Sequence, residues 1–321
     1  MREPLFKFCG VMLALVLLVG LKSQVISAAD AAKKAVAAEP AKAAEADAKL
    51  KPLNPEGTVL LDLEGKRLLL KTKVALREGQ LELLCCLKQT KEHESILALD
   101  SKAYVVHTGL VALKATTGKP AQFEPKFEPP TGHKLKVFLN WVDDDGKAHR
   151  VAAQTWVRHN THRWFAQKLE KLPAGLTIPE QSNLRYDSKH KELSWYGPMT
   201  AAQKAEFQKL NADKPYQAAI AAFHEQSQNH EMDAQWVFTG SGIYKDDDGK
   251  NHYLAEDGDL ISVANFSTAT IDVAIRSSAQ NDEGLSFESW TERIPPKGTP
   301  VTIELMPVFE AEKAEKLEAK D

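Results

Sequence analysis

The stretch TVLLDLEGKRLLLKTKVALREGQLELLCCL, from Thr58 to Leu87, carries the strongest fold signal in the sequence. It contains three apolar runs of strand length, TVLLDLE, RLLLKTKVAL and QLELLCCL. Gly65 and Gly79 lie between these runs, and glycine is a frequent turn residue because it adopts positive φ without strain. Short apolar runs bounded by such turns are typical of buried β-strands. The sequence therefore predicts a β-rich core that begins here.

The motif DDDGK occurs twice, at residues 143–147 and 246–250. Alternating apolar segments flank both copies, and Asp-Gly between such segments is a strong hairpin signal. A calcium-binding loop is the alternative, but an EF-hand requires a Glu about six positions after its Gly. Ala152 and Ala255 stand at those positions. We therefore expect two hairpins.

Helical signals are fewer. Asp100-Ser101 resembles a helix cap, and Tyr104, His107, Leu110 and Val111 follow at the spacing of one helical face. Between residues 166 and 232 the pattern changes to a small hairpin followed by two helices, the first capped by Thr200. The expected fold class is α+β: a β-rich main domain with hairpins and one or more packed helices, interrupted by a small helical insertion.

The two ends of the chain differ from this core. Residues 1–29 combine Arg2 and Lys7 with an apolar run and the small residues Ser27-Ala28-Ala29, as in a cleaved signal peptide, although an uncleaved membrane anchor is the alternative. We expect an exported protein, periplasmic or extracellular, without a stable membrane span after cleavage. The remaining expected boundaries are a disordered Ala/Lys/Glu-rich linker at 30–52, a discontinuous β-rich domain at 53–165 and 233–308, the insertion at 166–232 and a charged tail at 309–321.

Charge and cysteine content exclude several classes of protein. The formal net charge is −3 and no basic patch stands out, so nucleic acid is not an expected partner. Only Cys85 and Cys86 remain after signal-peptide cleavage. Two cysteines exclude a disulfide scaffold and also an iron–sulfur cluster held by four thiolates.

Seven segments occur in a fixed order along the chain: REGQLELLCCLKQTKEHESIL, AYVVHTGLVAL, FEPPTG, WVDDDGK, AQTWVR, WVFTGSGIY and DGDLISVANF. Together they resemble the YdjY-domain family of exported bacterial proteins over about 58–165 and 233–308. The resemblance implies an architecture and an exported location, and it implies no reaction. Some relatives are labelled iron–sulfur or ferredoxin-like, which two cysteines do not support here. The insertion resembles a small strand–strand–helix–helix module that is attached to other bacterial proteins.

The same region supplies the candidate site. Thiolate with imidazole suits zinc or copper, so ligands gathered from separate segments are one hypothesis. The zincin motif is absent, because Leu97 stands where a second histidine is required. A structural alternative has the KEHES segment tying a turn to the following helix, and a catalytic alternative has a cysteine thiolate with a histidine base oriented by a glutamate. The candidate residues are Cys85, Cys86, His93, Glu94 and His107.

Two further arrangements concern the adjacent cysteines and a pair of histidines. A disulfide between the adjacent cysteines requires a strained backbone, because neighbouring side chains of a strand point to opposite faces. His159 and His162 are three residues apart, but we expect them on an exposed strand end or loop rather than in a metal site.

The leading functional hypothesis is an exported, non-enzymatic binding or interaction protein. Its ligand is not named by the sequence, and the expected metal or small-ligand site lies around KEHES. A protein partner in the cell envelope is expected, with an apolar patch on the insertion as one place for it. The alternative is a cysteine- or metal-dependent enzyme.

Overall fold

The computed structural model describes residues 50–278 and 285–309. The predicted signal peptide (1–29), nearly all of the predicted linker (30–52) and nearly all of the predicted tail (309–321) lie outside these residues. No helix in the described ranges is long and apolar enough to cross a membrane.

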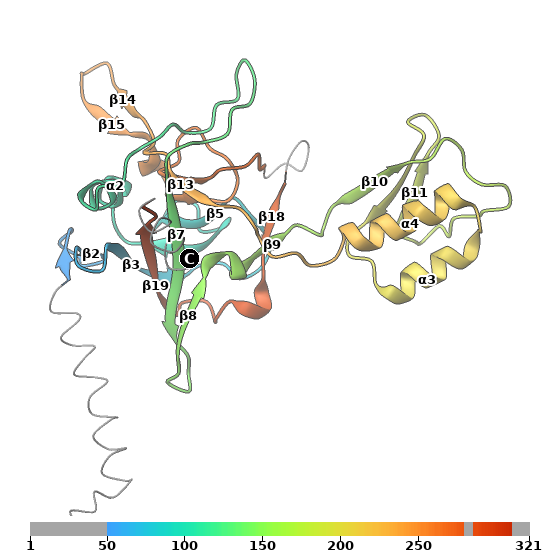
Figure 1. Cartoon of the computed structure of the whole chain (residues 1–321), viewed down its shortest axis with the longest axis horizontal. Coiled ribbons are helices and arrows are strands. Elements are labelled where there is room, and N and C mark those ends of the chain that lie inside the picture. The colour runs from blue at the N-terminus through green and yellow to red at the C-terminus, as the bar shows by residue number, and fades with distance from the viewer. Residues whose placement is uncertain (1–49, 279–284, 310–321) are drawn as a thin grey trace, which may run out of the picture. The chain divides into compact units, whose positions relative to one another are not determined.

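Eight strands pair side by side and close into a barrel (Figure 1). The ring closes where β3 pairs with β6, antiparallel from Thr72↔Leu99 to Val74↔Leu97. Most neighbours are antiparallel, whereas β5–β6 and β16–β17 are parallel. In ring order the strands are β3 (Arg67–Val74), β19 (Pro300–Pro307), β7 (His133–Val142), β13 (Trp236–Phe238), β17 (Ile271–Val273), β16 (Ile261–Ser262), β5 (Leu83–Leu87) and β6 (Ser95–Leu99).

The strand sequences account for the barrel interior. In β3, Leu68, Leu70 and Val74 are buried and alternate with more exposed residues, as expected for a strand with one face in the core. In β5, all five residues of LLCCL are buried. Such a continuous apolar run is typical of a strand covered on both faces.

The predicted α+β fold class is wrong. The described residues contain three short α-helices and are about 17% helical, and the main domain is a closed eight-stranded barrel rather than a sheet packed by several helices. The apolar runs show where strands lie, but the order in which they pair depends on contacts distant in sequence. The helices are α2 (Ala103–Ala112), α3 (Ala201–Leu210) and α4 (Lys214–Gln226).

Helix α2 starts and faces differently from the prediction. Its N-cap is Lys102, which makes no side-chain cap hydrogen bond, so Asp100-Ser101 is not the cap. Tyr104 and Val111, expected on one helical face with His107 and Leu110, are 58% and 49% exposed, whereas Leu110 is buried. Gly109 is also buried, and an added Cβ there would be 2.5 Å from a methyl carbon of Leu68. The helix therefore approaches the barrel closely at Gly109.

Both DDDGK hairpins are confirmed. The first joins β7 to β8 (Ala148–Ala152), and the second joins β14 (Ile243–Lys245) to β15 (Asn251–Tyr253). Gly146 and Gly249 have φ of +78° and +80°, the left-handed conformation that glycine adopts readily.

Residues 164–226 form a sheet and a helix pair with a core of their own. The sheet order is β10 (Trp164–Lys168), β12 (Glu192–Tyr196) and β11 (Leu184–Asp187). Thr200 caps α3 through a capping box, which confirms the predicted cap. The sheet begins before residue 166, and the predicted domain boundaries stay a prediction. The separate core includes Trp195, Tyr216, Ile220 and Phe223.

The remaining elements are short. They are β1 (Lys51–Pro52), β2 (Val59–Asp62), β4 (Gln80–Leu81), β9 (Val157–His159) and β18 (Phe287–Ser289), with 3₁₀-helices η1 (Ala153–Trp156), η2 (Leu254–Asp257) and η3 (Thr291–Arg293).

Candidate functional site

The two cysteines lie inside the barrel wall on β5. Both are free thiols and fully buried. Cys85 faces the main hydrophobic core. It pairs across the sheet with Leu97 of β6 on one side and with Ile261 of β16 on the other. Burial raises the pKa of both thiols. Neither cysteine is therefore positioned as an exposed thiolate nucleophile.

The KEHES segment forms a turn held by its lysine. Lys91 Nζ lies 2.9 Å from Asp259 Oδ1 and 3.7 Å from Glu94 Oε1. It also lies 4.0 Å from Glu82 Oε2. We call Lys91, Glu82, Glu94 and Asp259 the Lys91 cluster. Burial, together with a hydrogen bond between the Glu82 and Glu94 side chains, raises the pKa of Glu82 to about 7. The cluster fixes the turn to the segment directly before β16, as in the structural alternative, although the partner is not a helix.

His93 points away from this cluster. Its side chain is 75% exposed, and its Nε2 lies 3.7 Å from Glu94 Oε2. Sequence reasoning selected His93 and missed Lys91, the residue that makes the contacts. The charge pattern of KEHES contained that lysine, but Asp259 is 168 positions further along the chain and gave no local signal.

The five candidate ligands therefore occupy three different surroundings. The cysteines lie in the core, His93 and Glu94 lie at an exposed turn, and His107 lies on α2. Across the ranges 50–278 and 285–309, no group of three or more His, Cys, Asp or Glu residues is placed to hold a metal ion. The proposal of zinc or copper at these residues stays a prediction.

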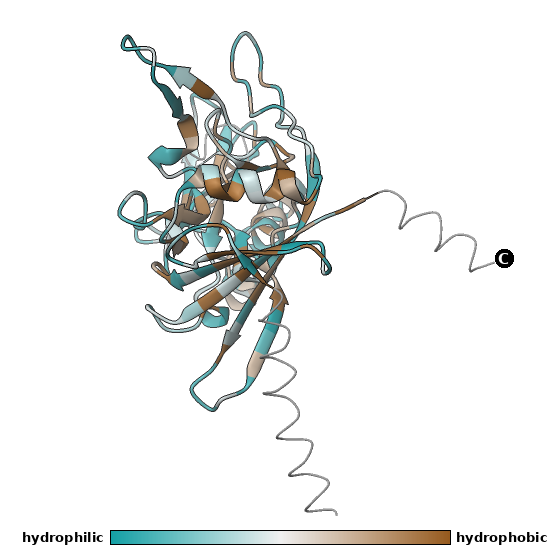
Figure 2. Cartoon of the chain, turned by 90° about the vertical axis from the view of Figure 1, so that its left-hand side faces the viewer, coloured by the Kyte–Doolittle hydropathy of each residue, from teal (hydrophilic) through white to brown (hydrophobic). Residues whose placement is uncertain are grey.

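His107 lines a cavity of about 850 Å³ beside α2, which we call the His107 cavity. Figure 2 views the side of the molecule that carries α2 and the β14–β15 hairpin, where loops are mainly hydrophilic and hydrophobic colour gathers on strands and helix. The walls come from the start of α2, the 240–243 loop, and the hairpin with the residues that follow it. The lining residues are Lys102, Tyr104, His107, Gly240, Ser241, Gly242, Ile243, Lys250, Asn251, His252, Tyr253 and Glu256.

Aromatic rings form one part of this cavity. The Tyr104 and His107 rings are stacked, with their centroids 6.5 Å apart. The Tyr104 and Tyr253 rings are edge-on to each other, with their centroids 6.1 Å apart. His107 Nδ1 lies 3.0 Å from Tyr253 Oη, which also donates to Gly240 O at 3.1 Å. Burial lowers the pKa of His107 and raises that of Tyr253 to about 12. At neutral pH both rings are therefore uncharged.

The 240–243 loop is held in an unusual conformation. Gly240 and Ser241 have φ of +85° and +53°. A Cβ on Gly240 would be 2.4 Å from Thr117 Cγ2, so glycine is required there. Ser241 adopts a conformation that residues other than glycine rarely adopt, and its hydroxyl donates to Thr268 O at 2.6 Å. Such outliers cluster at ligand-binding positions in proteins.

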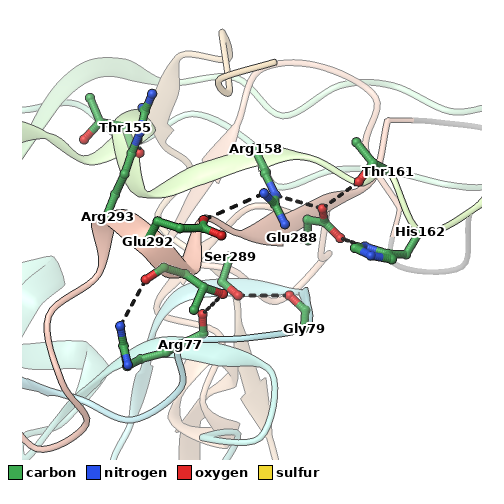
Figure 3. Close-up of polar contacts among 11 residues, drawn as sticks. Arg77, Gly79, Thr155, Arg158, Thr161, His162, Glu288, Ser289, Glu292 and Arg293 are labelled. Atoms are coloured by element: carbon green, nitrogen blue, oxygen red, sulfur yellow. Dashed lines mark hydrogen bonds and ion pairs between the residues drawn. The ribbon is translucent and has the colours of Figure 1, made fainter. Parts of the chain in front are cut away.

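A second, polar cleft of about 380 Å³ lies near β9 and β18. Figure 3 shows that Arg158, Thr161 and His162 converge on the Glu288 carboxylate. Arg158 Nε donates to Oε1 at 2.8 Å and His162 Nδ1 lies 2.8 Å from Oε2. Because Glu288 is only 4% exposed and these groups surround it, its charge is compensated within the protein. This arrangement connects strands that are distant in sequence.

The two histidines of RHNTHRW, His159 and His162, thus contact different partners. His162 contacts Glu288 with its side chain 58% exposed. His159 Nε2 instead lies 3.7 Å from Asp233 Oδ1, and burial lowers the pKa of His159. The pair was expected at a strand end, and β9 does end at His159.

The comparison with protein families concerns the first part of the barrel. The family model of the YdjY domain matches residues 59–170. The chain carries a YdjY domain. The match includes the cysteine strand, the KEHES turn and His107, and it confirms the resemblance over these residues. Residues 233–308 lie outside the match, although β13 and β19 from that region pair with the YdjY-domain strand β7.

No curated protein and no solved structure gives a significant match to this chain. The residues that sequence reasoning missed at the His107 cavity are mainly Tyr253 and Glu256. Neither has a local motif that marks it, and both reach the YdjY-domain helix α2 from about 150 residues further along the chain.

Proposed function

We propose that the chain is an exported, non-enzymatic binding protein whose ligand site is the His107 cavity. The observation that carries this proposal is an aromatic-lined cavity of about 850 Å³. Small-molecule sites typically have volumes of about 300–1,000 Å³, with apolar and aromatic walls and a few placed polar groups. The proposal moves the expected ligand site from the KEHES turn to His107.

The exposed apolar surface of the cavity supports ligand binding. Tyr104 is 58% exposed and Ile243 is 70% exposed. A ligand that covers these side chains removes apolar surface from water, which contributes roughly 25 cal/mol per Å² before the costs of association. The hydrogen bond between His107 and Tyr253 fixes the rings in advance, so little ordering is required on binding.

The enzyme alternative has less support from the geometry. The buried, protonated thiols do not suit cysteine catalysis. In the His107 cavity, the Ser241 hydroxyl donates to a backbone carbonyl and His107 Nδ1 is occupied by Tyr253. This geometry does not pair a nucleophile with a base, which covalent catalysis requires.

Binding at the His107 cavity is testable by a fragment screen followed by protein-observed NMR. We expect aromatic fragments to shift the resonances of Tyr104 and Tyr253. Tyr104→Ala should weaken the binding of these fragments about fivefold, because an aromatic contact of this kind contributes about 1 kcal/mol. Trp164→Ala, which removes an exposed aromatic side chain from β10, is the matched control. Fragments that bind equally well to Tyr104→Ala, or that shift only other regions, would overturn the proposal.

A protein-interaction role is the second candidate, and one observation favours it. Trp164 and Tyr196 are directly paired across β10 and β12, with centroids 5.3 Å apart and exposures of 51% and 40%. Exposed aromatic residues are enriched at interfaces. Retention of a cell-envelope protein by the wild type but not by a Trp164→Ala, Tyr196→Ala variant supports this role, and equal retention by both contradicts it.

A further inference from the structure

The ionisable side chains of the His107 cavity are of two kinds. Glu256 and His252 are engaged by neighbours: Glu256 Oε1 accepts the backbone N–H of Tyr104 at 3.0 Å, and His252 Nε2 lies 2.6 Å from Asp246 Oδ2. Lys102 and Lys250 also line the cavity. Within the described ranges neither lysine forms an ion pair with another residue. Their ammonium groups are thus positive charges of the cavity lining that have no ion-pair partner among the described residues.

The position of Glu256 explains why it does not neutralise these lysines. Helix α2 has no acidic residue in its first turn, and its N-cap Lys102 contributes no side-chain hydrogen bond. The first backbone N–H groups of a helix need acceptors and carry partial positive charge. Glu256 supplies that acceptor from the 3₁₀-helix η2, which follows the β14–β15 hairpin. One oxygen of its carboxylate is therefore bound to the start of the helix, and neither lysine forms an ion pair with it.

The two lysines approach the aromatic rings from different elements. Lys102 immediately precedes α2, two residues before Tyr104, and Lys250 immediately precedes β15, three residues before Tyr253. His107 and Tyr253 are uncharged at neutral pH, so the lysines supply positive charge to a cavity that also has aromatic rings in its lining. A ligand ring bound against Tyr104 and Tyr253 therefore shares one cavity with both lysines.

We propose that the His107 cavity selects small ligands that combine an apolar ring with a negatively charged group such as a carboxylate. This inference rests on the proposed binding function and names the chemical class of its ligand. The Tyr104 and Tyr253 rings contact the apolar part, and Lys102 and Lys250 pair with the anion. Each partly exposed ion pair contributes a few-fold in affinity, because water and salt screen it.

The test uses three probes that share a ring and differ in charge: 2-naphthoate, 2-naphthamide and 2-naphthylmethylammonium. Their dissociation constants are measured for the full-length protein by NMR titration at low salt. We expect naphthoate to bind about threefold to tenfold more tightly than naphthamide, and the ammonium compound to bind most weakly. The preference for naphthoate should shrink in 0.5 M NaCl, where the Debye length falls to about 4 Å.

Two variants separate the parts of the argument. A Lys102→Met, Lys250→Met variant should lose the preference for naphthoate while its affinity for naphthamide stays within about twofold. Lys171→Met, Lys189→Met, which removes two exposed lysines of the separate 164–226 segment, is the control for net charge and should keep the preference. Thermal unfolding of each variant confirms that it is folded.

The outcomes distinguish this inference from the proposed function. Equal binding of the three probes to the wild type, with loss of all three in Tyr104→Ala, would overturn the charge preference and leave the binding function in place. Tightest binding of the ammonium compound would also overturn the charge preference. Absence of binding by all three probes would count against the cavity as an aromatic ligand site and against its charge preference together.

Discussion

The two DDDGK hairpins have nearly the same turn and very different surroundings. In the first, Asp143 Oδ1 accepts the N–H of Lys147 at 2.8 Å and Oδ2 lies 2.6 Å from His149 Nε2. In the second, Asp246 makes the corresponding contacts with Lys250 at 2.7 Å and with His252 at 2.6 Å. The glycine conformations also agree. The turn is therefore specified by its own five residues and the histidine that follows.

The strands beyond the turns differ. Strand β7 is a barrel strand, paired with β19 on one side and with β13 and β8 on the other. Strands β14 and β15 pair with each other in a separate two-stranded sheet, with Ile243 70% and Tyr244 52% exposed. The first turn thus joins the barrel strand β7 to its neighbour β8. The second turn belongs to a hairpin that lines the His107 cavity. Local turn chemistry fixes a hairpin, whereas the pairing of its strands sets its role.

The largest expected difference is between matched side-chain deletions. Leu139 on β7 is fully buried, so Leu139→Ala should lower the free energy of unfolding by about 2–5 kcal/mol through lost burial and a residual cavity. Ile243→Ala on β14 should change it by less than about 0.5 kcal/mol, because the side chain is largely exposed. Urea denaturation followed by tryptophan fluorescence measures both. Equal effects would contradict the distinction between the hairpins.

Alanine at the turn glycines should produce a smaller effect. Left-handed φ costs a residue with a Cβ about 1 kcal/mol. We expect Gly146→Ala to lower the global free energy of unfolding by about that amount, because β8 pairs with the barrel strand β7 and should unfold with it. Gly249→Ala should instead speed hydrogen exchange at the hairpin amides with little global change. A full 1 kcal/mol global loss from Gly249→Ala would show that the second hairpin unfolds with the barrel.

Near neutral pH Glu82 of the Lys91 cluster titrates, whereas the Asp143 and Asp246 carboxylates of the hairpin turns do not. Glu82 keeps its proton to about pH 7 in the folded chain and to about pH 4.5 when unfolded. The folded state then binds more protons between these values, so stability decreases as pH rises through this window. Glu82→Gln should flatten the decrease, measured as urea midpoints from pH 5 to 8. An unchanged slope would count against the raised pKa of Glu82.

Asp272 is the matched comparison for that measurement. It is fully buried, and burial raises its pKa to about 7. Asp272→Asn should therefore remove a separate part of the decrease in stability with rising pH. The Asp143 and Asp246 carboxylates contribute nothing there, because hydrogen bonds from His149 and His252 lower their pKa values from 3.8.

The smallest effect should appear in acid. A carboxylate with a lowered pKa stabilises the folded state above its ordinary value, and this contribution is lost as pH falls through the folded pKa. The amide resonances of Lys147 and Lys250 should therefore shift together below about pH 3.8. Asp143→Asn and Asp246→Asn should each abolish the shift in its own hairpin only. Transitions more than about one pH unit apart would show that the turns are electrostatically different.

Much of the local structure could be predicted from the sequence. The hairpin turns, the strands of the opening stretch and the Thr200 cap all follow from residues close together in the chain. The closed barrel could not be predicted in this way, because β3 closes the ring with β6 on one side and pairs with β19, more than 200 residues away, on the other. Periodicity identifies strands and does not identify their partners.

The candidate site shows the same limit. His107 was selected from the sequence, but its partner Tyr253 is 146 residues away. The cysteines were grouped with His93 because they are neighbours in sequence, whereas strand geometry buries them in the barrel wall. Tyr104 was placed on one helical face with Leu110 because the spacing fits, whereas α2 buries Leu110 together with Gly109 and leaves Tyr104 exposed.

The position of β19 in the ring has a consequence for synthesis of the chain. Its residues Pro300–Pro307 pair with β3 and β7 on either side, and β3 is made more than 200 residues earlier. More than 200 residues therefore leave the ribosome after β3 before the barrel has its eighth strand. Until then the edges of β3 and β7 that later flank β19 present unpaired backbone groups, which invite pairing with other chains. A chaperone that shields those edges would act during this interval, and a nascent chain halted before residue 300 would be the form most prone to aggregate.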